Sequence, residues 1–300
     1  MQLGLHRRHY RIREVAPYIN WIYFYHAWGF PPKFAAVEIF SHCYSCMTNW
    51  VHSFPEEEQP KAKEALNLWE EAKQLLFFLD KKYETRGNVR LTECNSQTND
   101  ILLNIDGECC TLPLLRQQSG DAPLLCLSDF IRPIEQKIPD TIGLFCTTID
   151  AEVETLFPND DFKHLLAQTL ADRLAEATAE KLHEEVRKYL WGYSPDERLT
   201  IAQMNHEEFQ GIRPAIGYPS LPDISINRLI LPLLDYQQIG ISLTGNAMMK
   251  PHASVSGLMI SHPQSHYFSI GKIGEDQLAD YASRRGMSVD EIKPFLLSNL

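Results

Sequence analysis

A short loop carries the residues with the clearest chemical potential, and its sequence is Arg213-Pro214-Ala215-Ile216-Gly217-Tyr218-Pro219. Its two prolines restrict the backbone, and its glycine allows another group to approach the backbone closely. A rigid loop that presents a guanidinium group is well suited to binding a carboxylate through two hydrogen bonds. The pattern alone fits an ordinary rigid connection, with Arg213 in solvent, equally well.

A second set of polar side chains recurs at helical spacing: Glu176, Glu180, His183 and Arg187. Residues three and four positions apart lie on one face of a helix and form ion pairs there. On spacing alone, a solvent-exposed helix face is the favoured interpretation, ahead of a binding site.

Cysteine and histidine residues near the N-terminus offer a candidate metal site, His42-Cys43-x-x-Cys46 with His52 nearby. A zinc site needs a second ligand pair at a defined spacing, and none follows. Two cysteines packed among aromatic side chains are therefore the favoured interpretation, and no metal is expected. The chain has seven cysteines, an odd number, which is typical of reduced thiols in the cytoplasm.

Several common catalytic motifs do not occur in the sequence. There is no phosphate-binding GxGxxG or GxxxxGK[ST] loop and no GxSxG nucleophile elbow. His262 and His266 flank a predicted turn, for which a structural role is favoured over a catalytic one. No catalytic residue is assigned.

Composition sets the broad class. The 300 residues are 44% hydrophobic and 22% charged, which is the globular range. A net charge of −11 argues against a nucleic-acid partner bound through its phosphates. No run of about 18 apolar residues spans a membrane, and the basic N-terminus lacks the apolar core of a signal peptide. We therefore expect a cytoplasmic protein.

The elements that must position these residues can be read from hydrophobic periodicity. We expect a helix from Pro60 that Gly87 ends, a strand pair over 89–112 with a turn at Asp106-Gly107, and a central strand over 140–149. A long helix should run over 161–190 and a short one over 225–238. Strands over 253–260 and 267–273 should precede two final helices, the second opened by the capping box Ser288–Glu291.

Strands and helices mixed without strict alternation predict the α+β class. The aromatic segment 1–90 should pack on the main domain 91–300, so that 1–300 forms one continuous domain, with an insertion at 31–58.

The loop at Arg213 resembles the R-x-x-x-G-Y signature of the S-adenosylmethionine (AdoMet)-binding activation domain of cobalamin-dependent methionine synthase. Further motifs follow in the order and spacing of that family. Upstream they are Leu115-Arg116-Gln117-Gln118, Cys126-Leu127-Ser128-Asp129-Phe130, Asp140-Thr141-Ile142-Gly143, Ala171-Asp172-Arg173-Leu174-Ala175-Glu176, Leu182-His183-Glu184 and Trp191-Gly192-Tyr193. Downstream they are Ala253-Ser254-Val255-Ser256-Gly257, Ser261-His262-Pro263, Tyr267-Phe268 and Asp280-Tyr281-Ala282. Residues 1–90 match only weakly.

The resemblance implies a single curved α+β domain with a twisted antiparallel sheet and flanking helices. It also implies an extended AdoMet site. Asp129, Glu176 and Arg213 contact the ligand through side chains, with Arg213 on its carboxylate. Further contacts come from Ala215, Gly217 and Tyr218, and from Tyr267 and Phe268 beside them.

This chain departs from the family pattern at several places. Lys250-Pro251-His252 stands where the family favours Trp-Pro-Gly, and Phe268 lacks a tyrosine hydroxyl. The homocysteine, folate and cobalamin modules are missing, and so is the D-x-H-x-x-G loop that supplies the lower ligand of cobalamin. The chain is therefore expected to bind AdoMet and not cobalamin by itself.

The function that the resemblance implies is reductive methylation. AdoMet supplies the methyl group and a flavodoxin-like protein supplies the electron that restores inactive cob(II)alamin on a separate cobalamin-binding methionine synthase. Two alternatives stay open: a non-catalytic AdoMet-sensing or docking module, and a reactivator of another corrinoid methyltransferase.

Overall fold

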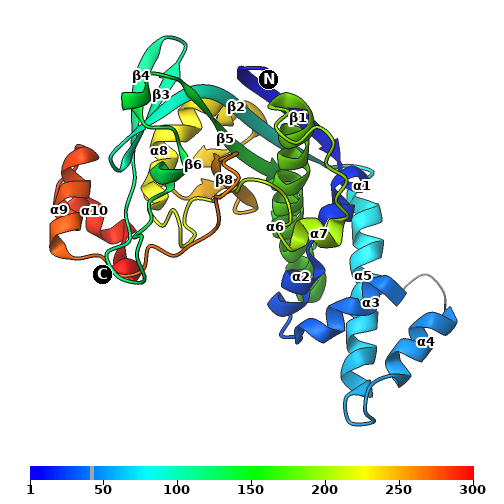
Figure 1. The fold of residues 1–300 in the computed structure, drawn as a ribbon. Coiled ribbons are helices and arrows are strands. Elements are labelled where there is room, and N and C mark those ends of the chain that lie inside the picture. The colour runs from blue at the N-terminus through cyan, green and yellow to red at the C-terminus, as the bar shows by residue number, and fades with distance from the viewer. Residues whose placement is uncertain (41–43) are drawn as a thin grey trace.

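The computed structural model describes residues 1–40 and 44–300, and an antiparallel sheet forms its centre (Figure 1). The long strand β2 pairs with β5 along one edge, and along the other it pairs first with β1 and then with β3. The path of the sheet is β4-β3-β2-β5-β8. The strands are β1 Gly4–Arg11, β2 Glu84–Gln97, β3 Asp100–Ile105, β4 Glu108–Pro113, β5 Asp140–Ile149 and β8 Ser254–Met259.

Both faces of this sheet are covered, which explains the continuous apolar run of β5. Two neighbouring residues of β2 show what covers each face, because successive side chains of a strand point to opposite faces of the sheet. A Cβ at Gly87 would lie 3.1 Å from Leu182 of helix α6 (Asp161–Glu185). The side chain of Asn88 donates to the carbonyl oxygen of Leu234, a residue beyond α8 (Asn227–Ile230), at 2.7 Å.

Helix α6 is the element on which the candidate site is built. It begins at Asp160, whose side chain accepts from the Lys163 N–H at 3.0 Å, as a good N-cap does. Leucines at helical spacing, among them Leu166, Leu170 and Leu174, are buried along it, and the last turn continues as a π-helical segment, Val186–Leu190. The helix crosses β2, β5 and β8 on one face of the sheet (Figure 1).

The N-terminal aromatic residues form a helical cluster against α5. The ring centroids of Trp21 and Trp69 are 4.4 Å apart, and Phe34 stacks on Phe54 at 5.0 Å. Aromatic pairs at these separations add to the stability that burial gives. The helices here are α1 Ile12–Val15, α2 Trp21–Ala27, α3 Val37–Phe40, α4 Tyr44–His52 and α5 Gln59–Leu79. That residues 31–58 are an insertion, and that 1–300 is one domain, stay predictions.

The remaining elements are short. They are α7 Ile201–Asn205, α9 Glu275–Arg284, α10 Val289–Ile292 and the two-stranded ribbon of β6 Ser242–Leu243 with β7 Met249–Lys250. The predicted capping box is confirmed, because Ser288 and Glu291 each accept from the other's backbone N–H.

Three expectations about elements are wrong. Gly87 lies inside β2, because α5 already ends at Leu79. The predicted strand pair is a three-stranded meander over β2, β3 and β4, with the predicted turn between the last two. Residues 267–273 form no strand, because their backbone bonds go to loops: the Ile270 N–H donates to the Pro219 oxygen at 2.9 Å.

Candidate functional site

The Arg213 loop is hydrogen-bonded to β8, so the sheet fixes its position. The Ile216 N–H donates to the Ser256 oxygen at 2.9 Å, and the Leu258 N–H donates to the Pro214 oxygen at 3.0 Å. Gly257 permits this pairing, because a Cβ there would lie 2.3 Å from the Pro214 oxygen. The loop therefore behaves as an additional short strand beside β8.

Gly217 turns the loop away from the sheet at a φ of +90°, which L side chains rarely adopt. Its N–H donates to the Leu221 oxygen at 2.8 Å, closing a compact turn. Tyr218, directly after it, is 56% exposed. Ala215, at the start of the turn, forms a bridge with Gly257. Ala215 and Gly217 thus offer backbone rather than side-chain groups, as a loop that contacts a ligand closely requires.

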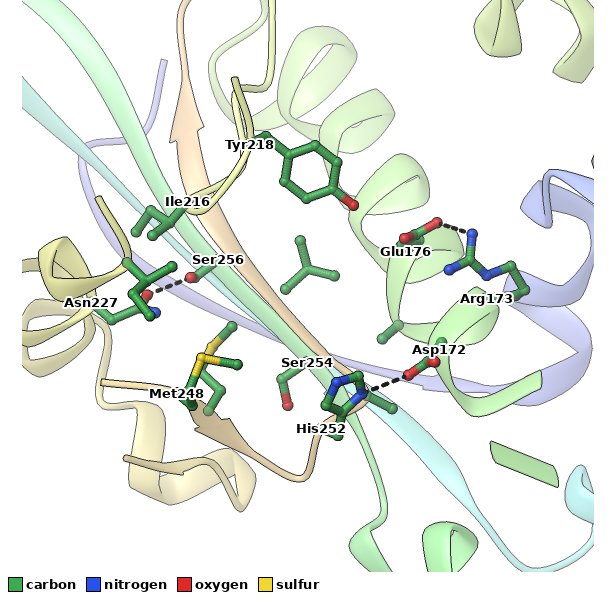
Figure 2. A pocket seen from close by; sticks show the side chains of 15 residues that line it. Asp172, Arg173, Glu176, Ile216, Tyr218, Asn227, Met248, His252, Ser254 and Ser256 are labelled. Carbon is green, nitrogen blue, oxygen red and sulfur yellow. Dashed lines mark hydrogen bonds and ion pairs between the residues drawn. The ribbon is translucent and has the colours of Figure 1, made fainter. Parts of the chain in front are cut away.

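A cavity of about 280 Å3 lies between this loop and α6. In Figure 2 the side chains of Asp172 and Glu176 project from α6, and the Tyr218 ring extends from the loop toward that helix. Of the predicted binding residues, Glu176 and Tyr218 line it. The volume suits part of a small molecule. The other lining residues are Asp172, Arg173, Ala175, Ile216, Ile224, Asn227, Met248, Met249, His252, Ala253, Ser254, Val255 and Ser256.

Carboxylates dominate the charge of this cavity. Burial raises the pKa of the Glu176 carboxyl; Arg173, whose Nη1 is 2.9 Å from it, partly offsets this, and Asp172 adds to the rise. Asp172 itself is 3.3 Å from Nδ1 of His252, which is largely exposed. Burial and the Glu176 charge also raise the pKa of Tyr218. A carboxylate whose charge is incompletely balanced favours a cationic ligand.

Arg213 does not stand free in solvent, which corrects the interpretation of its loop as an ordinary connection with the arginine exposed. Its side chain is 14% exposed; Nη2 forms an ion pair with Glu180 of α6, and Nη1 donates to the Ala179 oxygen at 3.2 Å. Burial alone would lower the pKa of Arg213, but the charge and hydrogen bond of Glu180 outweigh it and raise the pKa. No bond joins its Nε to another described residue, so one edge of the guanidinium is available.

The helix face that includes Glu180 is not a solvent-exposed stripe. His183 and Arg187 are completely buried. Arg187 forms an ion pair with Glu197 at 2.6 Å, and His183 Nε2 lies 3.3 Å from the Tyr193 hydroxyl. Burial, and then Arg187 and Arg213, lower the pKa of His183 well below its ordinary value. The segment after α6 folds back over this face, and sequence spacing gives no sign of it.

Tyr267 joins the site through the backbone of Arg213. The Arg213 N–H donates to the Tyr267 hydroxyl oxygen at 2.9 Å. Burial raises the pKa of Tyr267, so the hydroxyl keeps its proton and can donate a hydrogen bond to a ligand. The structure therefore brings Tyr267 to Arg213 and Glu176 to Tyr218. Glu180, which pairs with Arg213, links the two sets because it lies one helical turn after Glu176 on α6.

Asp129 and Phe268 form a second group. Asp129 accepts from both terminal nitrogens of Arg116, at 2.6 and 2.7 Å, and from the Cys126 N–H at 2.8 Å. Phe268 lies 6.3 Å from Phe130, centroid to centroid, and its carbonyl oxygen accepts from Ser220 at 2.6 Å. Asp129 is thus already ion-paired, and its role as a ligand contact stays a prediction.

Replacing Tyr267 with phenylalanine should weaken the backbone anchor of Arg213. Loss of one hydrogen bond costs about 0.5–1.5 kcal/mol, and water can replace the hydroxyl because Tyr267 is 37% exposed. We expect unfolding in urea to show a loss of stability in the lower half of that range. A loss well above it would show that water does not replace the hydroxyl and that the Arg213 N–H is left without a partner.

Potential metal ligands are dispersed over the described part of the chain. Within 1–40 and 44–300, no three His, Cys, Asp or Glu side chains gather around a common point. His42 and Cys43 of the candidate metal motif lie outside that range. Cys94, Cys109, Cys110, Cys126 and Cys146 are free thiols. Among the described helices, none has the length and hydrophobicity that crossing a lipid bilayer requires.

Known proteins resemble the chain over nearly its whole length. A family model described as the vitamin B12-dependent methionine synthase activation domain matches residues 11–286. A solved structure, the MetH reactivation domain bound to AdoHcy, superposes with a TM-score of 0.87 at 35% sequence identity. That alignment covers 100% of this chain and 91% of the other.

Proposed function

We propose that this chain, which belongs to the vitamin B12-dependent methionine synthase activation-domain family, binds AdoMet and supports methyl transfer to cobalamin held by a separate protein. The solved relative contains AdoHcy, which is AdoMet without the transferred methyl group. The observation in this chain that carries the proposal is the arrangement of Arg213, Glu176 and Tyr218 around one loop.

The residues present fit the chemical groups of AdoMet. The ligand has a carboxylate, which suits the free Nε edge of Arg213, and an ammonium and a sulfonium, which suit Glu176. Its adenine needs apolar surface, and Tyr218, Ile216 and Met248 provide it at the cavity. Asp129, Phe268 and the Ala215–Gly217 backbone are proposed as the remaining contacts.

The protein contributes position rather than acid–base chemistry. AdoMet supplies an electrophilic methyl group that its positive sulfur already activates. The chain's own residues hold the amino-acid end of the ligand on Arg213 and orient the rest along the Tyr218 loop. The methyl group is then held in a fixed orientation before its acceptor arrives, which lowers the entropic part of the barrier. We propose no catalytic residue in this chain.

Two partners follow from this proposal: a cobalamin-binding methionine synthase chain and a flavodoxin-like electron donor. What supports the first is membership of the family, whose name includes vitamin B12. A cobalamin-bearing synthase in the cob(II)alamin state should regain activity when this protein, AdoMet and reductant are all present. Recovery that is equal without this protein would contradict the proposal.

The direct test is calorimetry on the isolated chain. We expect heat of binding with AdoMet and none with hydroxocobalamin, because the D-x-H-x-x-G loop is missing from the sequence. AdoHcy should also bind, more weakly than AdoMet, since it lacks the positive charge that a cavity lined by Asp172 and Glu176 favours. Binding of hydroxocobalamin, or no heat with AdoMet, would overturn the proposed function.

A further inference from the structure

Glu180 is the only described acidic residue that forms an ion pair with Arg213. It projects from α6, one helical turn after Glu176, and its side chain is 21% exposed. One carboxylate oxygen bonds Nη2 of Arg213, while the other is buried without a hydrogen-bond partner in the described part of the chain. This second oxygen is therefore shielded from solvent.

Stability alone does not account for this arrangement. A buried carboxylate oxygen without a partner costs free energy, and replacing a buried ion pair by apolar groups is often neutral or stabilising. The Arg213 backbone is also already fixed, by the Tyr267 hydroxyl and by the pairing of Pro214 with β8. What Glu180 adds is the direction of the arginine side chain.

That direction leaves one edge of the guanidinium open. Glu180 and the Ala179 oxygen hold the two terminal nitrogens, and no described residue bonds Nε. An arginine has five N–H donors in a rigid fork, so anchoring one side aims the other.

We propose that Glu180 is a positioning residue that acts through Arg213 and aims it at the carboxylate of the ligand. This inference rests on the proposed AdoMet binding. Without the anchor, the arginine must be ordered when the ligand binds, and ordering one long side chain weakens affinity by roughly 3- to 10-fold. Glu180 itself does not contact the ligand.

The test compares two ligands on three variants. The ligands are AdoMet and decarboxylated AdoMet, which lacks the carboxylate. The variants are Glu180→Ala, Glu180→Gln and the control Glu185→Ala. Glu185 lies on the same helix, has the same exposed fraction of 21% and forms ion pairs with Arg8 and Lys181.

We expect Glu180→Ala to bind AdoMet roughly 3- to 10-fold more weakly and to bind decarboxylated AdoMet as the wild type does. Glu180→Gln keeps an oxygen that accepts from Arg213, so its loss should be smaller and its folding secure. Glu185→Ala should change neither affinity.

Equal losses for both ligands would overturn the inference, because they would show a general effect of charge or folding. Unchanged AdoMet affinity in Glu180→Ala would overturn it as well. A wild-type protein that binds no AdoMet would refute the proposed function instead, so the two failures are distinguishable.

Discussion

Arg213→Ala is expected to weaken AdoMet binding by roughly 10- to 150-fold. The arginine is held with one edge available, so its guanidinium needs little ordering before it bonds a carboxylate. Losing a hydrogen bond to a charged group costs about 1.5–3 kcal/mol, and each 1.4 kcal/mol is a factor of ten. Lysine should rescue only part of the loss, because a point charge does not reproduce the planar fork. Calorimetry measures both affinities.

The same substitution should also lower stability, which the sequence alone does not predict. From sequence, the partner of Arg213 is the ligand and folding should hardly change. In the structure, removing Arg213 leaves Glu180 largely buried and unpaired, at a cost of about 1–3 kcal/mol. Unfolding in urea without ligand measures this loss.

A double variant, Arg213→Ala with Glu180→Ala, separates the two effects. It should recover most of the lost stability, because no unpaired carboxylate remains, but none of the lost affinity. Wild-type affinity in Arg213→Ala would refute the assignment of Arg213, made from the family resemblance, as the residue that binds the ligand carboxylate. A large loss of stability with unchanged affinity would show that Arg213 is a structural contact only.

Periodicity was sufficient to predict elements whose burial is one-sided or complete. The central strand over 140–149 is β5, and the long helix over 161–190 is α6 with the π-helical segment that continues it. The helix is marked by apolar residues at the helical period, and β5 by a continuous apolar run, because both of its faces are buried. The curved α+β fold is confirmed by the match to the solved relative.

The strand over 267–273 was wrong for a physical reason. Its apolar residues Phe268 and Ile270 pack into the hydrophobic core, but its backbone groups form hydrogen bonds with loops and not with a neighbouring strand. A sequence shows which side chains are apolar, and it does not show where the backbone finds its hydrogen bonds. Strand assignments without a visible partner are weak for this reason.

The site was predictable only where a motif marks it. The Arg213 loop stood out by its prolines and glycine, but Glu180 did not, because its spacing with His183 and Arg187 equally fits an exposed face. What buries that face is the chain after α6, through Glu197 and Tyr193. Cavity residues such as Asn227 and Met248 have no local signal, since only the tertiary fold brings them to Glu176.

Gly257→Ala is expected to be the most destabilising single substitution proposed for this site. A Cβ at this position would lie 2.3 Å from the Pro214 oxygen and 2.9 Å from the Ala215 Cα, and both are backbone atoms. Rotating a side chain cannot relieve such contacts, so β8 and the Arg213 loop must separate. Overpacking typically costs about 1–3 kcal/mol, and a clash with backbone belongs at or above the upper end.

Binding should fall with stability in this variant, because the loop that carries Arg213 and Tyr218 loses its pairing with β8. Gly245→Ala is the matched control: no atom lies within 4 Å of a Cβ there, and its φ is not in the left-handed region. The control should unfold in urea and bind AdoMet as the wild type does. Two glycine variants of equal stability would contradict the close approach of loop and strand. A Gly257→Ala protein that is less stable yet binds AdoMet normally would show that the loop holds its ligand geometry without β8.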